Sequence, residues 1–395
     1  MNLIVGGVNL LDISRIREDF PIAERYNYLN SAAIGIIPKS NLEALNKFSQ
    51  RRILEIPHPD LYHNEYLKLT EETRELFARL IKAEKDEISF QPNTSMGINL
   101  IAEMLNWKRG DNVIVTDLGY PSGIYPWLRL KKRGLTTKIL KNRDGLIDVS
   151  DFEEAIDQNT RVISVSFVSF ANGYRHDLEA LGKLAKQNNI YLVVDAIQGL
   201  GYLDLDVRKC RIDFLTSGNY KWLMAPFGAA EFYCCKKLLE ELESPHVGWF
   251  SARDPFDLTL SPYKRSRTAR MFEPGNPSFL SIFGIRESLK YISRLGMASI
   301  RKTIFKLRNT LVEGLQELDT WVPSPNGERH GSAIVFANLP SCVGEKVYAA
   351  LKKRNIVVSQ RSFNGRSGVR IAPSFWNTHE EVEALIDVFR ELTSK

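Results

Sequence analysis

The sequence predicts an α/β fold in which a mostly parallel sheet of about seven strands lies between helices, followed by a smaller α+β C-terminal domain. Short runs rich in Val, Ile and Phe alternate with amphipathic helical patterns along most of the 395 residues, as in a sheet covered by helices. The runs are continuously apolar, which is typical of strands buried on both faces. After Pro277 the pattern changes to a long amphipathic stretch and then to short mixed elements.

Seven segments are the strand candidates of the large sheet. In chain order they are Glu87–Gln91, Asn112–Thr116, Thr137–Leu140, Arg161–Val168, Ile190–Val194, Ile212–Thr216 and Ala229–Cys234. Helical patterns lie between them, for instance over 177–188, where the apolar residues share one face. Because ligands bind beyond the carboxyl ends of the strands in such sheets, the residues that follow each strand are the ones to inspect.

The C-terminal third predicts a separate, smaller unit. A long amphipathic stretch, 282–318, is broken near Gly296. Beyond it we expect strands near 333–336, 356–358 and 369–371, and helices near 344–353 and 379–392, the last beginning at Thr378. We therefore expect an N-terminal arm (1–30), a large α/β domain (31–280) and a small domain (281–395).

Composition and charge exclude several classes of protein. A hydrophobic fraction of 44% and a charged fraction of 25% are ordinary for a globular protein, and the net charge of +6 is too small to argue for nucleic acid. The four cysteines lack a C-x-x-C spacing, which fits a reducing compartment. No stretch approaches the roughly 18–20 apolar residues of a membrane span, and the first residues do not read as a signal peptide. We expect a cytoplasmic protein that binds neither membrane nor nucleic acid.

Two further features favour no special function. His58 and His63 are five residues apart with Pro59 between them, which does not suit a metal pair on a helix, so no metal is expected. The basic run SPYKRSRTAR (261–270) is typical of a solvated loop, with the steering of an anionic substrate as the alternative.

Two charged residues stand at the ends of neighbouring strand candidates. Asp195 ends the apolar run IYLVVD, where a carboxylate is costly to bury unless it meets a cation or hydrogen-bond donors. Lys221 follows the strand at 212–216 in a loop between Tyr220 and Trp222, where desolvation would lower its pKa. Taken separately, a helix N-cap would explain the aspartate, and a surface lysine lying on the Trp ring would explain the lysine.

Together, the pair indicates pyridoxal 5′-phosphate (PLP). A lysine and a carboxylate at adjacent strand ends suit this cofactor, because the lysine forms a Schiff base with it and the carboxylate keeps its pyridine nitrogen protonated. No G-x-G-x-x-G or P-loop pattern follows the strand candidates, so dinucleotide and NTP sites lose their main support.

Seven segments of the chain also match a known pattern. They are YLNSAAIG (28–35), NTSMGIN (93–99), YPSGIYPW (120–127), VVDAIQGLG (193–201), SGNYKWLMAPFG (217–228), FEPGNPS (272–278) and VRIAPSFWNTHEEV (369–382). In this order they resemble the fold-type I PLP enzymes of the aminotransferase class V family, which includes cysteine desulfurases, selenocysteine lyases, isopenicillin-N-epimerase-like proteins and kynureninases. The resemblance implies a PLP-dependent homodimer with shared active sites.

The resemblance also implies roles for individual residues. Lys221 is the Schiff-base lysine, Asp195 the partner of the pyridine nitrogen, and the other cofactor contacts are Thr94, Ser95, Tyr120, Ser169, Gln198, Ser217, Tyr220 and Asn276. Thr94 and Ser95 open a helix whose free N–H groups favour a phosphate, although such residues are also ordinary caps. On the substrate side the resemblance implies Arg370, whose guanidinium suits a carboxylate, together with Asn30 and Ala33.

The sequence departs from the family where the reaction is decided. Cysteine desulfurases carry a nucleophilic cysteine shortly before the carboxylate-binding arginine, but 359–368 reads SQRSFNGRSG, and Cys342 is too far upstream. The asparagine often found near residue 170 is replaced by Ser169 and Phe170, and no histidine precedes Lys221. Asn276 stands where a threonine of the other subunit often binds the phosphate.

These observations predict a PLP enzyme that acts on an amino acid, with Lys221 as the base at Cα. Because the desulfurase cysteine is missing, a class V aminotransferase is favoured, with a C–S or C–Se lyase or an epimerase as the alternative. A non-catalytic protein that keeps the fold for binding is a third possibility, but such a scaffold has no need of the Lys221–Asp195 pair.

Overall fold

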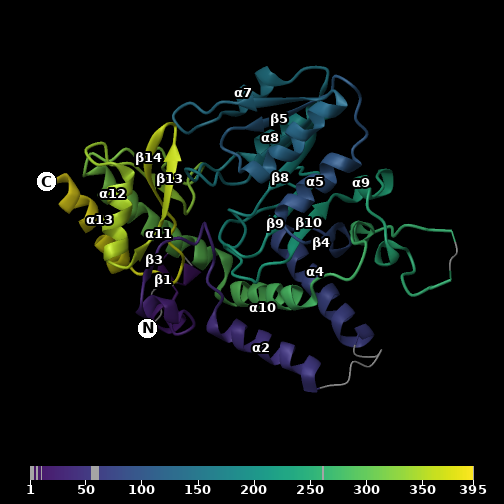
Figure 1. Cartoon of the computed structure of the whole chain (residues 1–395), viewed down its shortest axis with the longest axis horizontal. Helices are drawn as coiled ribbons and strands as arrows, with labels where there is room; N and C mark the ends of the chain where they lie inside the picture. Colours follow the sequence, from purple (N-terminus) through teal and green to yellow (C-terminus); the bar gives the residue numbers. More distant parts are fainter. Residues whose placement is uncertain (1–3, 6–7, 10, 55–61, 260–261, 395) are drawn as a thin grey trace.

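The computed structural model of the chain describes residues 4–5, 8–9, 11–54, 62–259 and 262–394. Its main feature is a seven-stranded sheet with the strand order β4-β10-β9-β8-β7-β5-β6 (Figure 1). Strands β5 to β9 pair in parallel, whereas β10 is antiparallel to both of its neighbours. The predicted sheet, mostly parallel and of seven strands, is confirmed.

The seven strands lie within two residues of the predicted segments. They are β4 (Ile88–Gln91), β5 (Asn112–Thr116), β6 (Thr136–Leu140), β7 (Thr160–Ser166), β8 (Tyr191–Asp195), β9 (Phe214–Gly218) and β10 (Ala230–Cys234). Their side chains alternate between two separate apolar layers. Because both faces are covered, the central strands have no polar side, and this explains their continuous apolarity.

Helices cover both faces of the sheet, as predicted. On one face, α4 (Lys68–Ile81), α8 (Leu178–Gln187) and α10 (Phe279–Leu295) pack their apolar sides on the strands. On the other face, α5 (Thr94–Met104) packs against side chains of β5, β8 and β10. Gly97 of α5 lies so close to the sheet that an added Cβ would be 2.4 Å from the hydroxyl of Thr216.

The remaining elements connect these layers. The helices are α1 (Ile13–Arg17), α2 (Lys39–Leu54), α6 (Tyr125–Arg129), α7 (Val149–Ala155) and α9 (Lys236–Glu241), and a π-helical turn covers Tyr62–Leu67. Short 3-10 turns cover Pro21–Glu24, Lys85–Glu87, Pro121–Gly123, Leu130–Arg133, Trp249–Ser251 and Ala269–Phe272. Strands β1 (Ile4–Val5) and β2 (Val8–Asn9) pair with each other near the N-terminus.

The C-terminal part has its own three-stranded antiparallel sheet, β11-β14-β13, with bounds Val335–Ala337, Arg366–Ile371 and Ser359–Phe363. Helices α11 (Met297–Gln316), α12 (Gly344–Lys353) and α13 (His379–Thr393) share its apolar core.

In this part of the chain, the predicted break at Gly296 is confirmed, since this glycine joins α10 and α11 with a φ of +81°. Thr378 caps α13 as predicted. Strand β13 was not predicted.

The N-terminal segment, which includes Phe20 and strand β3, packs against the C-terminal part of the chain. Strand β3 (Asn27–Tyr28) pairs in parallel with β12 (Ile356–Val357), so the predicted strand at 356–358 lies beside this segment and outside the three-stranded sheet. Phe20 stacks on Trp376 with ring centroids 5.0 Å apart.

The division of the chain into domains near residues 30 and 280 remains a proposal. Across the described ranges, no helix has both the length and the apolar character that a membrane span requires.

Candidate active site

The predicted pair lies where two strands of the large sheet end. Asp195 is the last residue of β8 and pairs with Thr216 of β9, while Lys221 follows β9 in the next loop. Both side chains are buried, with exposed fractions of 5% and 8%. The Asp195 carboxylate accepts a hydrogen bond from the N–H of Ile197 at 3.1 Å, and residues 197–202 form turns without a helix. The helix-cap explanation of Asp195 is therefore wrong.

The environment shifts the two groups in opposite directions. Burial lowers the pKa of Lys221 to about 8, although the Asp195 charge opposes this shift. Burial also raises the pKa of Asp195 to about 6, with Lys221 acting in the other direction. A lysine with a lowered pKa has a larger neutral fraction, which suits both Schiff-base formation and proton abstraction. The surface-lysine explanation is wrong, since Lys221 is buried and the indole of Trp222 donates to Gln198 at 3.0 Å.

The loop that carries Lys221 is held by backbone contacts. The carbonyl of Tyr220 accepts a hydrogen bond from the N–H of Gly35 at 2.8 Å, and the carbonyl of Lys221 accepts one from Met224 at 3.0 Å. A Cβ atom on Gly35 would lie 1.7 Å from the Lys221 carbonyl oxygen. Position 35 therefore requires glycine, because the two backbones approach closely there.

The start of α5 lies beside this loop. Asn93 caps the helix by accepting from the N–H of Met96, so the capping role considered for Thr94 and Ser95 belongs to the residue before them. The Thr94 hydroxyl accepts from the N–H of Gly218 at 2.8 Å and joins the helix start to the end of β9. Ser95 donates to Ser122 at 2.8 Å. First-turn N–H groups at such a helix start suit a phosphate.

Two tyrosines face the lysine ammonium. The Nζ atom of Lys221 lies 5.7 Å from the ring centroids of both Tyr120 and Tyr220. Tyr120 is 46% exposed and meets the ring of Phe170 edge-on, at 5.0 Å between centroids, while Tyr220 stacks on Phe227 at 4.5 Å. An exposed aromatic face above a buried lysine is the arrangement that a flat cofactor ring needs for stacking.

Arg370 brings a buried charge from the small sheet to the same place. It lies on β14, and it is only 2% exposed. It donates to the carbonyl of Phe170 at 2.9 Å, but its Nε has no hydrogen-bond partner, and no described carboxylate forms an ion pair with it. Burial lowers its pKa to about 10. A buried guanidinium with a spare donor fits a carboxylate ligand.

The N-terminal segment lies between Arg370 and the lysine loop. Asn30 accepts a hydrogen bond from Ser359 at 2.8 Å, and the hydroxyl of this serine lies 3.5 Å from Nη2 of Arg370. Ala33 is partly buried, and its N–H donates to the carbonyl of Asn30. Both predicted substrate-side residues thus lie in the segment that joins Arg370 to the Lys221 loop.

The other predicted cofactor contacts are buried near the strand ends, but they are occupied by protein partners. Gln198 donates to the carbonyl of Ala32 at 3.0 Å and accepts from Trp222. Ser169 accepts from the N–H of Ala171 at 3.2 Å, and Ser217 is fully buried on β9. Roles for these residues toward the cofactor remain proposals.

Asn276 lies apart from the other predicted residues. It is exposed and lines a cavity of about 570 Å³ together with Met96 and His246. Neither Asp195 nor Lys221 lines this cavity. A role of Asn276 in the active site would therefore have to come from a second copy of the chain, and this dimeric arrangement remains a proposal.

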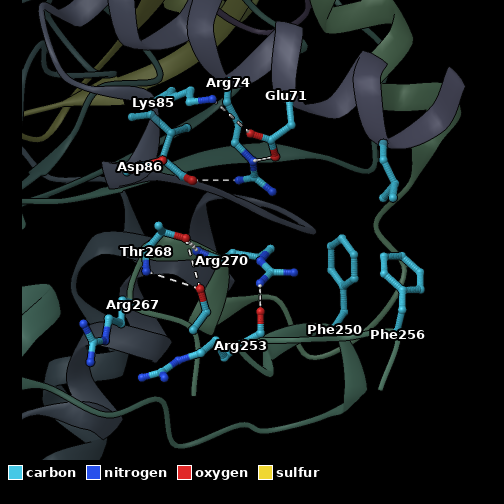
Figure 2. Close-up of a pocket in the computed structure, with 13 residues that line it drawn as sticks. Glu71, Arg74, Lys85, Asp86, Phe250, Arg253, Phe256, Arg267, Thr268 and Arg270 are labelled. Atoms are coloured by element: carbon cyan, nitrogen blue, oxygen red, sulfur yellow. Dashed lines mark hydrogen bonds and ion pairs between the residues drawn. The ribbon is translucent and has the colours of Figure 1, made fainter. Parts of the chain in front are cut away.

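A cavity of about 640 Å³ lies elsewhere, between α4 and the segment 250–270 (Figure 2). None of the predicted site residues lines it. Two of its four arginines have structural partners: Arg74 bonds Glu71 and Glu273, and Arg270 donates to the carbonyls of Ala252 and Arg253. The basic run is only in part the predicted solvated loop. Residues 262–264 and 267 are exposed, whereas Ser266 is buried and Arg265 donates to the carbonyls of Leu239 and Glu240.

No metal centre emerges from the ranges that the structure describes, since no three His, Cys, Asp or Glu side chains are grouped to hold an ion. His58 lies outside the described residues.

Sequence reasoning missed three contacts of the site. Phe170 supplies a ring against Tyr120 and a carbonyl to Arg370. Ser359 and Arg361 come from β13, and the Arg361 charge acts on the pKa of both Lys221 and Arg370. The alternating pattern of SQRSF was the available signal for β13, but it contains a single large apolar residue.

The arrangement fits one class of chemistry. A lysine with a lowered pKa, a buried carboxylate at the neighbouring strand end and the open start of α5 match the aldehyde, pyridine nitrogen and phosphate of PLP in turn. The fold is that of a fold-type I PLP enzyme, and the residues at the strand ends fit its cofactor.

Comparison with known proteins gives the family. The model of the family "Aminotransferase class-V" matches residues 27–385, so the chain belongs to this PLP-dependent family, as the sequence resemblance indicated. A probable cysteine desulfurase of Pyrococcus abyssi is 31% identical and covers 95% of this chain and 96% of its own length. An uncharacterized aminotransferase of Bacillus subtilis is 26% identical over 82% of this chain and 84% of its own length.

Solved structures agree with this assignment. The apo structure of a cysteine desulfurase from Thermococcus onnurineus has a TM-score of 0.86 and 30% identity, covering 96% of this chain and 98% of its own. The cystine C–S lyase C-DES, in complex with its product cysteine persulfide, has a TM-score of 0.86 over 95% of this chain and 99% of its own. At 19% identity, C-DES shows the shared fold alone.

Proposed function

We propose that this chain is a PLP-dependent lyase that breaks the Cβ–S bond of a sulfur-containing amino acid by elimination. Two relatives that are 31% and 29% identical to this chain are named probable cysteine desulfurases, which supports a substrate with a C–S bond. The observation that carries the proposal is the absence of a thiol beside Lys221. The same missing cysteine favoured an aminotransferase from sequence alone, and that activity is the second candidate.

All four cysteines are described, and each lies away from the site. Cys234 pairs with Phe214 at the start of β9, the end opposite to the Lys221 loop, and Cys235 follows it. The backbone of Cys210 packs against α8. Cys342 packs on the core behind β14, on the face opposite to Arg370. A desulfurase needs a thiolate that accepts sulfur from the substrate, and this placement argues against such a transfer.

The residues of the site have distinct tasks in an elimination. PLP, when bound, withdraws electrons from Cα of the substrate. Arg370 binds the α-carboxylate, and Lys221 removes the proton from Cα. Asp195, at the neighbouring strand end, holds the proton on the pyridine nitrogen.

The products follow from the balance of atoms and electrons. The Cβ–S bond breaks with its electron pair leaving on sulfur, which takes up a proton as thiol or sulfide. The remaining enamine hydrolyses to pyruvate and ammonia, so no external oxidant or reductant is needed. A desulfurase would instead release alanine and leave sulfur on a protein thiol, and an aminotransferase would pass the amino group to a 2-oxo acid.

Product analysis tests the proposal. Purified protein reconstituted with PLP is incubated with L-cysteine, and sulfide, pyruvate and alanine are measured. We expect equal amounts of pyruvate and sulfide without alanine, loss of both in Lys221→Ala, and no change in Cys342→Ser. Alanine formation that depends on Cys342 would establish a desulfurase. Amino transfer to an added 2-oxo acid, without sulfide, would establish the aminotransferase.

We also propose that the active enzyme is a cytoplasmic homodimer in which Asn276 of one copy reaches the site of the other. The exposure of Asn276 in a cavity that includes Met96, from the first turn of α5, supports this arrangement. Sedimentation of the purified protein would test it, since a monomer that is fully active would contradict it.

A further inference from the structure

Strand β13 carries two residues of the site on one face. Ser359 pairs with Arg370 of β14, and Arg361 pairs with Gly368 two residues along. Because side chains two residues apart in a strand share a face, Arg361 lies on the face of Ser359 and Arg370. Figure 1 shows β13 and β14 at the edge of the C-terminal part that faces the large sheet.

The hairpin that carries Arg361 is fixed to the large sheet. Asn364, at its turn, donates to Asn142 at 2.8 Å and accepts from the same side chain at 3.2 Å. Asn142 in turn donates to Asp117, just beyond β5. Phe363 packs against Phe336 on the inner face of the small sheet. The position of Arg361 relative to Lys221 is therefore set by both sheets.

The Arg361 charge has no acidic partner among the described residues. Its guanidinium donates to the carbonyl of Gln360 at 2.8 Å, and its side chain is exposed. A nearby acid of the hairpin region, Glu345, accepts from Gln360 and Ser367 instead. Burial is the main cause that lowers the pKa of Lys221 and of Arg370, and the Arg361 charge adds to the lowering of both, so Arg361 lies within electrostatic reach of the two groups.

The charges around the site are unbalanced for a simple amino acid. Arg370 binds the α-carboxylate, and Lys221 is opposed by Asp195. Arg361 then remains as a cation without a counter-charge among the described residues, on the strand face that it shares with Arg370. A guanidinium in this position favours a second carboxylate, which it can bind through two parallel hydrogen bonds.

We propose that Arg361 binds a carboxylate at the far end of the substrate's side chain, so that the preferred substrates are amino acids whose sulfur substituent carries an acidic group. This inference rests on the proposed function for the placement of the α-carboxylate at Arg370, but it does not depend on the type of reaction that follows.

A matched pair of substrates tests it. S-carboxymethyl-L-cysteine and S-carbamoylmethyl-L-cysteine have the same shape and differ in the charge of the distal group. With the holoenzyme, we expect kcat/KM for pyruvate release to favour the carboxylate by about tenfold, as one charge-assisted contact allows. Arg361→Gln should abolish the preference, whereas Arg361→Lys should keep part of it. Arg366→Gln, which changes an arginine of the same hairpin that lies over the Trp321 ring, should leave the preference intact.

A binding readout separates this inference from the proposed reaction. The shift of the cofactor absorbance gives the Kd of each compound even when no product forms. Tighter binding of the carboxylate, lost in Arg361→Gln, supports the inference even if pyruvate is absent and the lyase proposal fails. Equal affinity for both compounds in the wild type, or a preference unchanged in Arg361→Gln, would overturn it.

Discussion

The two halves of the site differ in how their charges and polar groups are satisfied. At the ends of β8 and β9, Lys221 and Asp195 oppose each other, and Thr94 bonds the backbone of β9. On the small sheet, Arg370 and Arg361 have no acidic partner within the described chain. The comparison indicates that the lysine and the aspartate at the strand ends balance each other's charge, whereas the two arginines of the small sheet lack a counter-charge among the residues that the structure describes.

This difference has a structural cause. Parallel strands bring the ends of β8 and β9 to one buried edge, where a charge is tolerated only with a nearby counter-charge or donor. The hairpin β13–β14 lies at the border between the two parts of the molecule, where an arginine can reach solvent or a ligand. We therefore expect substitutions on the two sides to affect different quantities.

The largest effect is expected on the cofactor side. In the proposed function, Lys221→Ala removes the group that both forms the Schiff base and accepts the Cα proton, so turnover should fall by about 10²–10⁴-fold or more. The visible absorbance of the Schiff base should disappear with it. Lys236→Ala, at an exposed lysine paired with Glu84, is the matched control and should retain both signals. Full activity in Lys221→Ala would contradict the assignment of Lys221 to the cofactor side of the site.

Arg370→Ala should affect the substrate side alone. Loss of a buried guanidinium that binds a carboxylate costs about 2–5 kcal/mol, which corresponds to a rise in KM of roughly 30-fold or more. The cofactor absorbance should stay as in the wild type, and Arg370→Lys should recover part of the affinity. Equal losses of cofactor and substrate binding would show that the two halves are not independent.

Glu231 sharpens the comparison, because it is an exception on the cofactor side. It lies on β10 opposite Ser217, and its side chain is fully buried with the Asn219 side chain as its polar neighbour. Burial raises the pKa of Glu231 from 4.5 to about 8. The folded state therefore holds this proton more tightly than the unfolded state between these pH values.

The sign of the pH effect follows directly. The stability that the protonated Glu231 contributes is fully present below pH 4.5 and is lost as pH rises through about 8, by an amount on the order of 4 kcal/mol. Denaturant unfolding at pH 5 and pH 9 measures this loss. Glu231→Gln, which keeps the shape without the titration, should flatten the profile. An unchanged slope in this variant would assign the pH dependence to other groups.

The smallest effect is expected at the contact between the N-terminal segment and the lysine loop. Gly35→Ala would place a methyl group against the backbone of Lys221 and should destabilise the fold by about 1–3 kcal/mol, as other overpacked sites do. Thermal unfolding measures the change. Gly123→Ala is the control, since no atom lies within 4 Å of its added Cβ. Equal melting temperatures of Gly35→Ala and the wild type would mean that the N-terminal segment can shift away from the Lys221 loop without loss of stability.

Patterns in the sequence were enough to predict the large sheet, the helix break at Gly296 and the Lys221–Asp195 pair. These features leave a local record, because burial on both faces makes strands continuously apolar and a charge at their end then stands out. The motifs also indicated Arg370, whose role stays a prediction, and the family, which the family model confirms. Strand β13 was not predicted from the sequence, because it is partly exposed and mostly polar.

Which of these residues come into contact depends on how the chain folds in three dimensions. The contacts of Arg370 with Phe170, of Gly35 with the lysine loop and of Thr94 with β9 join residues that are far apart in the chain. Likewise, the absence of an acidic partner for Arg361 among the described residues depends on which side chains the fold places near it. The local sequence pattern indicates whether a residue is buried. Whether a charged side chain meets a group of opposite charge depends on distances in space, and these depend on how the two sheets pack together.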